Sequence, residues 1–305
     1  MSEQAVAVAP AAHARQHRPW LLLLGDTWRQ TRTKLGVTLV VLLVGTAVIG
    51  PLFAPFAPEE SVKIAGQFIL PFAAPSDAAT LGTDNLGRDV LSRFLWGGRS
   101  VLALSALATV FGAVLGIAIG LVAAYSRGFL DDLLMRGMDV ILAFPQLVFA
   151  LVVVATVGPK LWLLVLAVGI TTMPRVARVT RGAAVEVVER DFVRAAESLG
   201  ESKRKILFFE ILPNITSPLV VEASLRLTFN IAVIAALSFL GFGLQPPAAD
   251  WGLMINENRQ GLLAGQPWGV LLPVAAIGLL TIGTSLIGDG FARAAIGIQR
   301  GKAAA

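Results

Sequence analysis

Residues 190–214 read RDFVRAAESLGESKRKILFFEILPN and form the longest charge-dense run between two apolar segments of this chain. Hydrophobic residues recur in this run too regularly for a flexible tail. We expect a first short helix that stops at Gly200, because glycine accepts the left-handed conformation that ends helices. A second helix is expected from Ser202, a favourable N-cap residue, and Pro213 is expected to break it.

Two interpretations of residues 190–214 stay open on the residues alone. Ala195 and Ala196 would present a small, flat face that the surface of another protein can approach closely. The run is then a docking element on a membrane protein. The alternative is an ordinary amphipathic loop that lies on the membrane surface.

The composition indicates an integral membrane protein. The chain has 305 residues, of which 55% are hydrophobic and 15% charged, against about 25% charged residues in soluble proteins. It has no cysteine, which excludes disulfides and thiolate metal sites. Its two histidines, His13 and His17, lie in the N-terminal tail, which excludes a buried histidine relay. The net charge of +5 is attributed to membrane topology and not to nucleic-acid binding.

Long apolar runs predict an all-α protein with six transmembrane helices, because about 20 apolar residues cross a bilayer. A cleavable signal peptide is a weaker alternative for the first run, since that run starts late and no cleavage pattern follows it. The expected spans are residues 35–53, 101–125, 133–157, 161–179, 218–242 and 268–288.

Basic residues set the orientation of these spans. With the N-terminus inside, eighteen of the 25 Lys and Arg residues fall in inner segments and six in outer segments, while Arg226 lies within a span. Cytoplasmic segments carry such an excess. Both termini and residues 190–214 are therefore predicted to be cytoplasmic. The six tryptophans agree, since all lie at or beside span ends.

A glycine stripe marks the second span. Gly112, Gly116 and Gly120 lie four residues apart, so they share one helix face and let a neighbouring helix approach closely. Packing within this chain is the favoured interpretation, and a subunit interface is the alternative.

A polar stripe marks the fifth span. Glu222, Arg226 and Asn230 share one helix face, and charges inside a bilayer normally face protein or a water-filled path. We expect Glu222 to pair with Arg226 one turn away. The stripe either lines a solute pathway or is a structural pair near the cytoplasmic end of the span.

The outer loop contains LGTDNLGRDVLSR at residues 81–93. Its two aspartates and two arginines are expected to form a salt-bridged knot that fixes the entry to the second span. Paired carboxylates also suggest a metal site, but the interleaved arginines favour charge compensation. The chain has no nucleotide-binding loop, because its one Gly-Lys pair, Gly301-Lys302, lacks the earlier glycine.

Three of these stretches together resemble one family, the inner-membrane permease subunits of ABC importers of the dipeptide, oligopeptide and nickel type, and within it the C-type subunit. Residues 190–214 resemble the family's EAA loop, whose pattern is E-A-A-x3-G-x9-I-x-L-P. The pattern departs at Arg194, where the family has an acidic residue, and at Glu210, where it has isoleucine. Residues 81–93 resemble the segment before the second span, and LSFLGFG at 237–243, followed by QPP and WG, resembles the exit of the fifth span. The matching positions of the EAA loop are Ala195, Ala196, Gly200, Leu212 and Pro213.

The resemblance implies the type I importer permease fold in the bacterial inner membrane and a set of partners. A second, similar permease chain would complete the pore, two ATPase subunits would bind ATP and Mg, and an extracytoplasmic binding protein would deliver a peptide or related small solute. This chain would then be no enzyme and would hold no cofactor or metal. The residues implied in ATPase coupling are Arg194, Ala195, Ala196, Glu197, Leu199, Gly200, Leu212 and Pro213.

The chain is accordingly divided into four parts. Residues 1–33 are a cytoplasmic tail with a short interfacial helix, and residues 34–99 are the first span with a long outer loop. Residues 100–292 are a five-helix core with a cytoplasmic coupling loop at 180–216, and residues 293–305 are a cytoplasmic tail. The alternative function is an ion-coupled secondary transporter, which favours ionisable residues at mid-membrane and an internal repeat. A membrane enzyme is a weaker third class, since no His, Cys or carboxylate cluster lies in or beside the spans.

Overall fold

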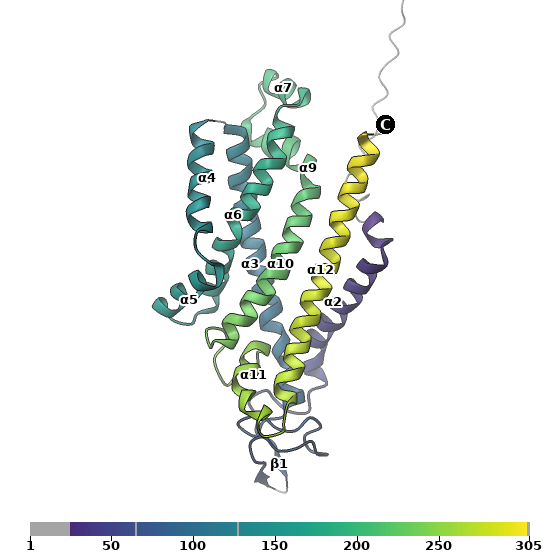
Figure 1. Ribbon diagram of the computed structural model, residues 1–305, viewed down its shortest axis with the longest axis vertical. Helices are drawn as coiled ribbons and strands as arrows, with labels where there is room; N and C mark the ends of the chain where they lie inside the picture. Colours follow the sequence, from purple (N-terminus) through teal and green to yellow (C-terminus); the bar gives the residue numbers. More distant parts are fainter. Residues whose placement is uncertain (1–24, 65, 127, 304–305) are drawn as a thin grey trace, which may run out of the picture.

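A computed structural model describes residues 25–64, 66–126 and 128–303. The predicted interfacial helix lies largely before residue 25, outside the described residues. The fold is a bundle of long helices with a small extracytoplasmic cap that carries a two-stranded hairpin (Figure 1). The long helices are α2 (Thr31–Ile49), α3 (Val90–Ser126), α6 (Leu161–Val188), α10 (Thr216–Phe239) and α12 (Trp268–Ala303).

Shorter elements connect these helices. The hairpin pairs Lys63 with Phe68 in antiparallel register. The short elements are η1 (Gly50–Leu52), β1 (Lys63–Ile64), β2 (Gln67–Phe68), α4 (Phe129–Leu142), α5 (Gln146–Val157), α7 (Asp191–Ser198), α8 (Lys203–Lys205), the π-helix η2 (Ile206–Ile211), α9 (Leu212–Asn214), α11 (Trp251–Asn258) and η3 (Arg259–Leu262).

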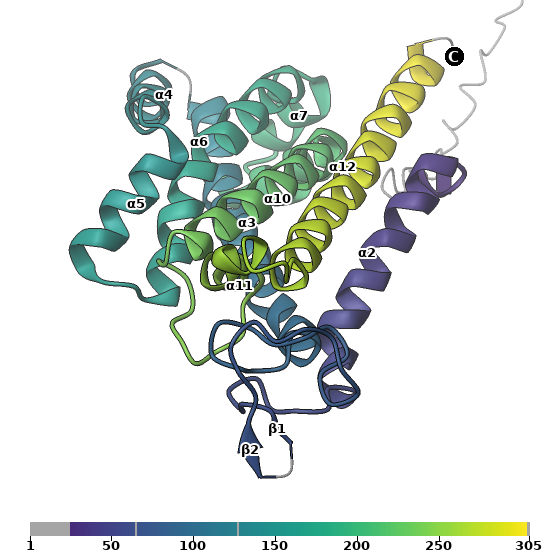
Figure 2. The same ribbon diagram turned by 60° about the horizontal axis from the view of Figure 1, so that its bottom comes forward.

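Within the described ranges, five helices are long and apolar enough to cross a membrane, and the pair α4 and α5 makes a sixth span if counted as one. The start of α2, the end of α12 and α7 lie at one end of the bundle, and the hairpin lies at the other (Figures 1 and 2). This arrangement agrees with the predicted topology, in which both termini and residues 190–214 share a side.

The third span is not the continuous helix that the sequence predicted. α4 and α5 meet at a bend of 79°, and α5 turns away from the bundle direction (Figure 1). Pro145 explains the break, because proline lacks an N–H group and disfavours helical backbone at the residue before it. Pro145 becomes the N-cap residue of α5.

Other helix boundaries also differ from those that the sequence predicted. α3 begins at Val90 and not near residue 101, since the Asp89 carboxylate accepts a hydrogen bond from the Ser92 backbone N–H at 2.8 Å and caps the helix. α6 continues past residue 179 to Val188, because Pro174 is accommodated inside it. The part assigned as the C-terminal tail, residues 293–305, is helical as far as Ala303, because α12 runs on to that residue.

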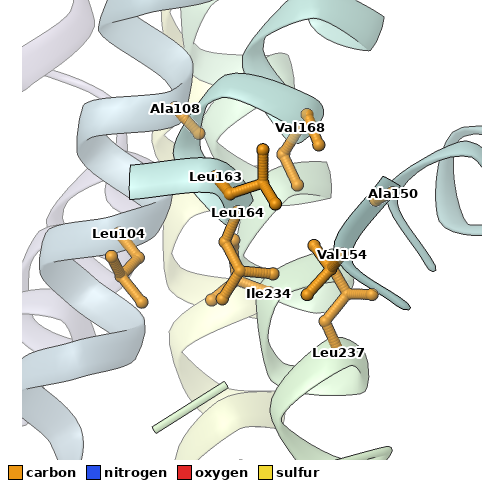
Figure 3. Close-up of a cluster of buried hydrophobic side chains, with 10 residues drawn as sticks. Leu104, Ala108, Ala150, Val154, Leu163, Leu164, Val168, Ile234 and Leu237 are labelled. Carbon is orange, nitrogen blue, oxygen red and sulfur yellow. The ribbon is translucent and has the colours of Figure 1, made fainter. Parts of the chain in front are cut away.

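Four apolar clusters hold the described part of the bundle together, and the smallest joins α3, α4 and α6 around Met173. One joins α3, α5, α6 and α10, where Val154 of α5 lies beside Leu237 of α10 (Figure 3). A second joins α2, α3, α10, α11 and α12 around the buried Trp251. The third lies beneath residues 190–214 and is described with the site.

Candidate functional site: a cytoplasmic docking segment

The helix α7 has the predicted end at Gly200. The Gly200 N–H donates to the Glu197 carbonyl at 3.0 Å, and the Glu201 N–H donates to the Ala196 carbonyl at 3.1 Å. Gly200 has φ of +76°. These bonds form a Schellman motif, whose left-handed position favours glycine. Asp191 in the first turn complements the helix dipole.

The second helical piece begins at Ser202, as predicted, with the Ser202 hydroxyl accepting from the Lys205 N–H at 3.4 Å. The prediction that Pro213 breaks this piece was wrong. The chain first widens into the π-helix η2, and Pro213 then lies in the first turn of α9. Proline is tolerated there because its missing N–H has no partner in a first turn.

A buried apolar cluster fixes this segment to the membrane helices. Val193, Ile206 and Ile211 from the segment are each at most 1% exposed. They pack against side chains of three long helices, and Ala196 and Leu212 lie half-buried against the same cluster. The members from the long helices are Leu121 and Ala124 of α3, Ala184, Val187 and Val188 of α6, and Leu219 of α10.

The outer surface of the segment differs from the expected alanine face. Ala195 is exposed, but Ala196 is half-buried, because adjacent residues of a helix point about 100° apart. The exposed large apolar side chains of the segment are Leu199, which is 83% exposed, together with Phe192, Phe208 and Phe209. The exposed surface of the segment thus combines the small Ala195 with four large apolar side chains, which the sequence did not single out.

Charged residues border this surface. Arg194 and Glu197 are exposed, and Pro213 is exposed beside the half-buried Leu212. Arg194 and Glu197 line a pocket of about 340 Å³ together with Tyr125, Val188 and Lys203.

The predicted polar stripe of α10 is buried within this chain. The Arg226 Nε lies 2.8 Å from a Glu222 carboxylate oxygen, so the expected pair forms. Arg226 also lies over the Phe229 ring, 5.1 Å from its centre. The assignment of the stripe to a solute pathway stays a prediction.

Asn230 has partners on three other helices that sequence reasoning missed. Its Oδ1 accepts from Gln146 Nε2 of α5 at 3.1 Å and lies 3.1 Å from the Thr172 hydroxyl of α6. Its Nδ2 donates to the Thr109 hydroxyl of α3 at 2.9 Å. Asn230 itself is 0% exposed. The spacing within α10 carried no signal for these contacts, because all three partners are distant in sequence.

The glycine stripe of α3 faces α6. A β-carbon on Gly112, Gly116 or Gly120 would lie 2.5–2.6 Å from a backbone oxygen of α6. Real β-carbons do not approach oxygen so closely, so only glycine permits this helix spacing. The stripe is therefore a packing surface between two helices of this chain.

The salt-bridged knot of the outer loop forms around Asp84 and gains an additional member, whereas Asp89, the second predicted aspartate, instead accepts from the Ser92 N–H and hydroxyl at the start of α3. Arg88 Nε lies 2.7 Å and Arg93 Nε 3.2 Å from Asp84 Oδ2. Both arginines also pair with Glu257 of α11, at 3.1 and 2.8 Å. Glu257 was missed because its partners lie far away in sequence. The knot ties the cap, the start of α3 and α11 together.

Asp250 begins α11 beside this knot and is 0% exposed. Its carboxylate accepts from the Leu253 N–H at 3.0 Å and from the Ser100 hydroxyl. Burial raises the pKa of Asp250 above its usual value, and these hydrogen bonds oppose the rise.

Comparison with known proteins identifies the family. A family model described as the inner membrane component of binding-protein-dependent transport systems matches residues 116–296. The chain belongs to this family. It is 37% identical to a di/tripeptide transport system permease protein of Pseudomonas aeruginosa over 84% of each chain. It is also 38% identical to a glutathione transport system permease protein of Pectobacterium atrosepticum, over 73% of this chain and 78% of that one.

Solved structures show the same fold at low identity. A chain of the MetNI methionine ABC transporter, in an inward-facing conformation, superposes with a TM-score of 0.53 at 18% identity, covering 67% of this chain and 96% of that chain. A chain of an amino acid ABC transporter gives a TM-score of 0.51 at 22% identity, covering 66% of this chain and 93% of that one. The family member described here is thus a permease subunit of an ABC importer and a multi-pass protein of the bacterial inner membrane. Its membership implies a partner ATPase.

Proposed function

We propose that this permease subunit imports di- or oligopeptides, or a related small solute, and that α7 is the helix through which ATP hydrolysis drives transport. A second permease chain completes the pathway. Two ATPase subunits bind ATP and Mg beneath the pair, and an extracytoplasmic binding protein delivers the solute. This chain contributes no catalytic group and holds no cofactor.

The observation that carries the proposal is the contrast between the two faces of residues 190–214. The inner face is anchored in the cluster around Val193, whereas Leu199, Phe208 and Phe209 are exposed at the outer face. Exposed apolar patches bordered by charged residues are typical of protein–protein interfaces. An ATPase seated there would cover apolar area that water otherwise contacts.

The anchoring also gives a way to transmit movement. Val193, Ile206 and Ile211 interlock with α3, α6 and α10. Closely packed cores transmit displacement because they have little compressibility. A partner that moves α7 therefore moves the three helices with it, and does not merely deform a loop. Alternating access follows when these helices tilt against the second permease chain.

The solute class rests on the relatives. The permeases similar to this chain carry names for di/tripeptide, dipeptide and glutathione transport. Peptides share a carboxylate and an amino group whatever their side chains. We infer that this chain takes a solute of that class, delivered by its binding protein.

Reconstitution of the complete importer in proteoliposomes tests the proposal. We expect uptake of a labelled dipeptide that requires ATP, the ATPase subunits and the binding protein, and that unlabelled di- and tripeptides compete. Ala195→Arg should reduce solute-stimulated ATP hydrolysis about tenfold, since a bulky cation on the docking face costs about 1.4 kcal/mol or more of interface energy. Gly182→Arg, at an exposed glycine of α6 with open space around it, serves as the control. Uptake driven by an ion gradient without the ATPase subunits would contradict the proposal.

A further inference from the structure

The buried amide of Asn230 joins four helices at one point. Its side chain contacts Gln146 of α5, Thr172 of α6 and Thr109 of α3, while Asn230 itself belongs to α10. Thr172 lies about five helical turns before residues 190–214 and Asn230 about four turns after them, on the two helices that enter and leave that segment. A movement of α6 relative to α10 would therefore change the distances between Asn230 and its hydrogen-bond partners.

Among the partners of Asn230, Gln146 differs from the two threonines, because within the described residues its side chain donates to no acceptor of its own helix. The Thr109 hydroxyl already donates to the Ser105 carbonyl at 2.7 Å, and the Thr172 hydroxyl donates to the Val168 carbonyl at 2.7 Å. Each hydroxyl has one hydrogen, so both are satisfied within their own helices. The Gln146 amide is then the one full donor to Asn230 Oδ1. A leucine at position 230 would leave neither threonine unpaired.

α5 packs on the bundle through one side, where Leu147, Phe149, Leu151 and Val153 are partly buried against the cluster of α3, α6 and α10. It follows the bend at Pro145, and its fully buried side chains are Ala150 and Val154. Val148 and Val152 on its other side are exposed. The Gln146 amide adds to this apolar packing a polar contact with α10 at the first turn of α5, and such a hydrogen bond contributes about 1 kcal/mol net.

We propose that the Gln146–Asn230 hydrogen bond is a latch that holds α5 against α10 in the resting importer, and that movement of α6 and α10 opens it during transport. The proposal rests on the proposed function, in which α7 transmits that movement. Asn230 is a positioning residue in this view. It acts through α5 and need not touch the solute.

Gln146→Leu removes the latch while keeping the size of the side chain. Loss of one net hydrogen bond of about 1 kcal/mol shifts a two-state equilibrium about fivefold. We expect the variant importer to assemble normally, to hydrolyse ATP about fivefold faster without solute, and to move about fivefold less solute per ATP. Thr156→Val is the matched control on α5, since the Thr156 hydroxyl bonds only to carbonyls of its own helix.

The absence of cysteine from the sequence permits a second readout that needs neither solute nor hydrolysis. A single Val153→Cys substitution places a thiol on the half-buried face of α5. In the purified importer, its labelling by a water-soluble maleimide is read by the mass of this chain. We expect slow labelling that a non-hydrolysable ATP analogue accelerates about fivefold. With Gln146→Leu, labelling is fast with and without nucleotide.

Two results would contradict the proposal that the Gln146–Asn230 hydrogen bond is a latch. One is a Gln146→Leu importer with wild-type labelling and coupling. The other is loss of assembly in Gln146→Leu but not in Thr156→Val, which makes the bond purely structural. A wild-type importer whose ATP hydrolysis ignores solute contradicts the proposed function instead, and the labelling rates without nucleotide still decide whether Gln146 holds α5.

Discussion

Arg93 Nη2 lies 2.8 Å from a Glu257 carboxylate oxygen, although 164 residues separate the two in sequence. The same arginine donates to the carbonyls of Pro58 and Pro247. One buried guanidinium thus joins the loop after α2, the start of α3 and the segment before α11. The extracytoplasmic cap is held by charge pairing and not by a large apolar core of its own.

Removing Glu257 should therefore destabilise the cap. Glu257→Leu leaves Arg88 and Arg93 buried with Asp84 as their one shared carboxylate partner in the knot. Breaking a buried ion pair costs about 3–5 kcal/mol, so we expect a clear fall in thermal stability in detergent. Glu201→Gln is the control, because its pair with Lys205 is solvent-exposed and should contribute less than about 1 kcal/mol. Equal effects of the two substitutions would contradict this account of the knot.

The two types of helical glycine should respond in opposite directions to alanine. A β-carbon at Gly116 would lie 2.6 Å from the Met173 carbonyl oxygen, whereas Gly137 of α4 has open space around it. Gly116→Ala should destabilise the chain by about 2 kcal/mol, since α3 and α6 must separate. Gly137→Ala should be neutral or stabilise it by up to about 1 kcal/mol. Thermal unfolding of both variants checks this, and a harmless Gly116→Ala would refute the close packing.

Asp250 should make stability depend on pH. Its raised pKa means that the folded state binds the proton more tightly than the unfolded state. The stabilisation from this group is thus full below about pH 3.9, the usual pKa of aspartate, and is lost as the pH rises through the folded pKa. The melting temperature of wild type minus that of Asp250→Asn should therefore fall with rising pH. A constant difference between the two proteins would show that burial does not shift this carboxyl.

Arg226→Leu separates the two interpretations of the polar stripe. It leaves Glu222 buried without its partner, so a loss of about 3–5 kcal/mol in stability is expected. The double variant Glu222→Leu with Arg226→Leu removes both charges and should recover stability. If the stripe lines the solute pathway, uptake stays low in the double variant. Recovery of uptake together with stability would make the pair structural.

The sequence predicts the parts of this protein whose signal is local. Gly200 and Ser202 mark helix ends that the structure has, and the spacing of Gly112 and Gly116 indicates a packing face. Pro145 was overlooked, because an average over a long apolar window hides one residue that bends a helix by 79°. Glu257 and Gln146 could not be found, since their roles depend on partners brought close only by the fold.

The proposed docking surface shows the same division. Charge and apolar periodicity point to residues 190–214 as its position, which stays a prediction, but they carry no signal for the inward turn of Ala196. Whether Ala196 faces inward depends on the rotation of α7 about its axis, which is set by packing against the cluster around Val193. The exposed Ala195, and not Ala196, is therefore the position at which to probe the surface.

The most direct test of the central claim is photo-crosslinking from position 195 in the assembled importer. A benzophenone amino acid replaces Ala195 in one variant and Ala264, exposed near the opposite end of the bundle, in another. We predict that position 195 captures an ATPase subunit and that position 264 does not. Capture of the ATPase from 264 but not from 195, or of no nucleotide-hydrolysing partner from either, would contradict it.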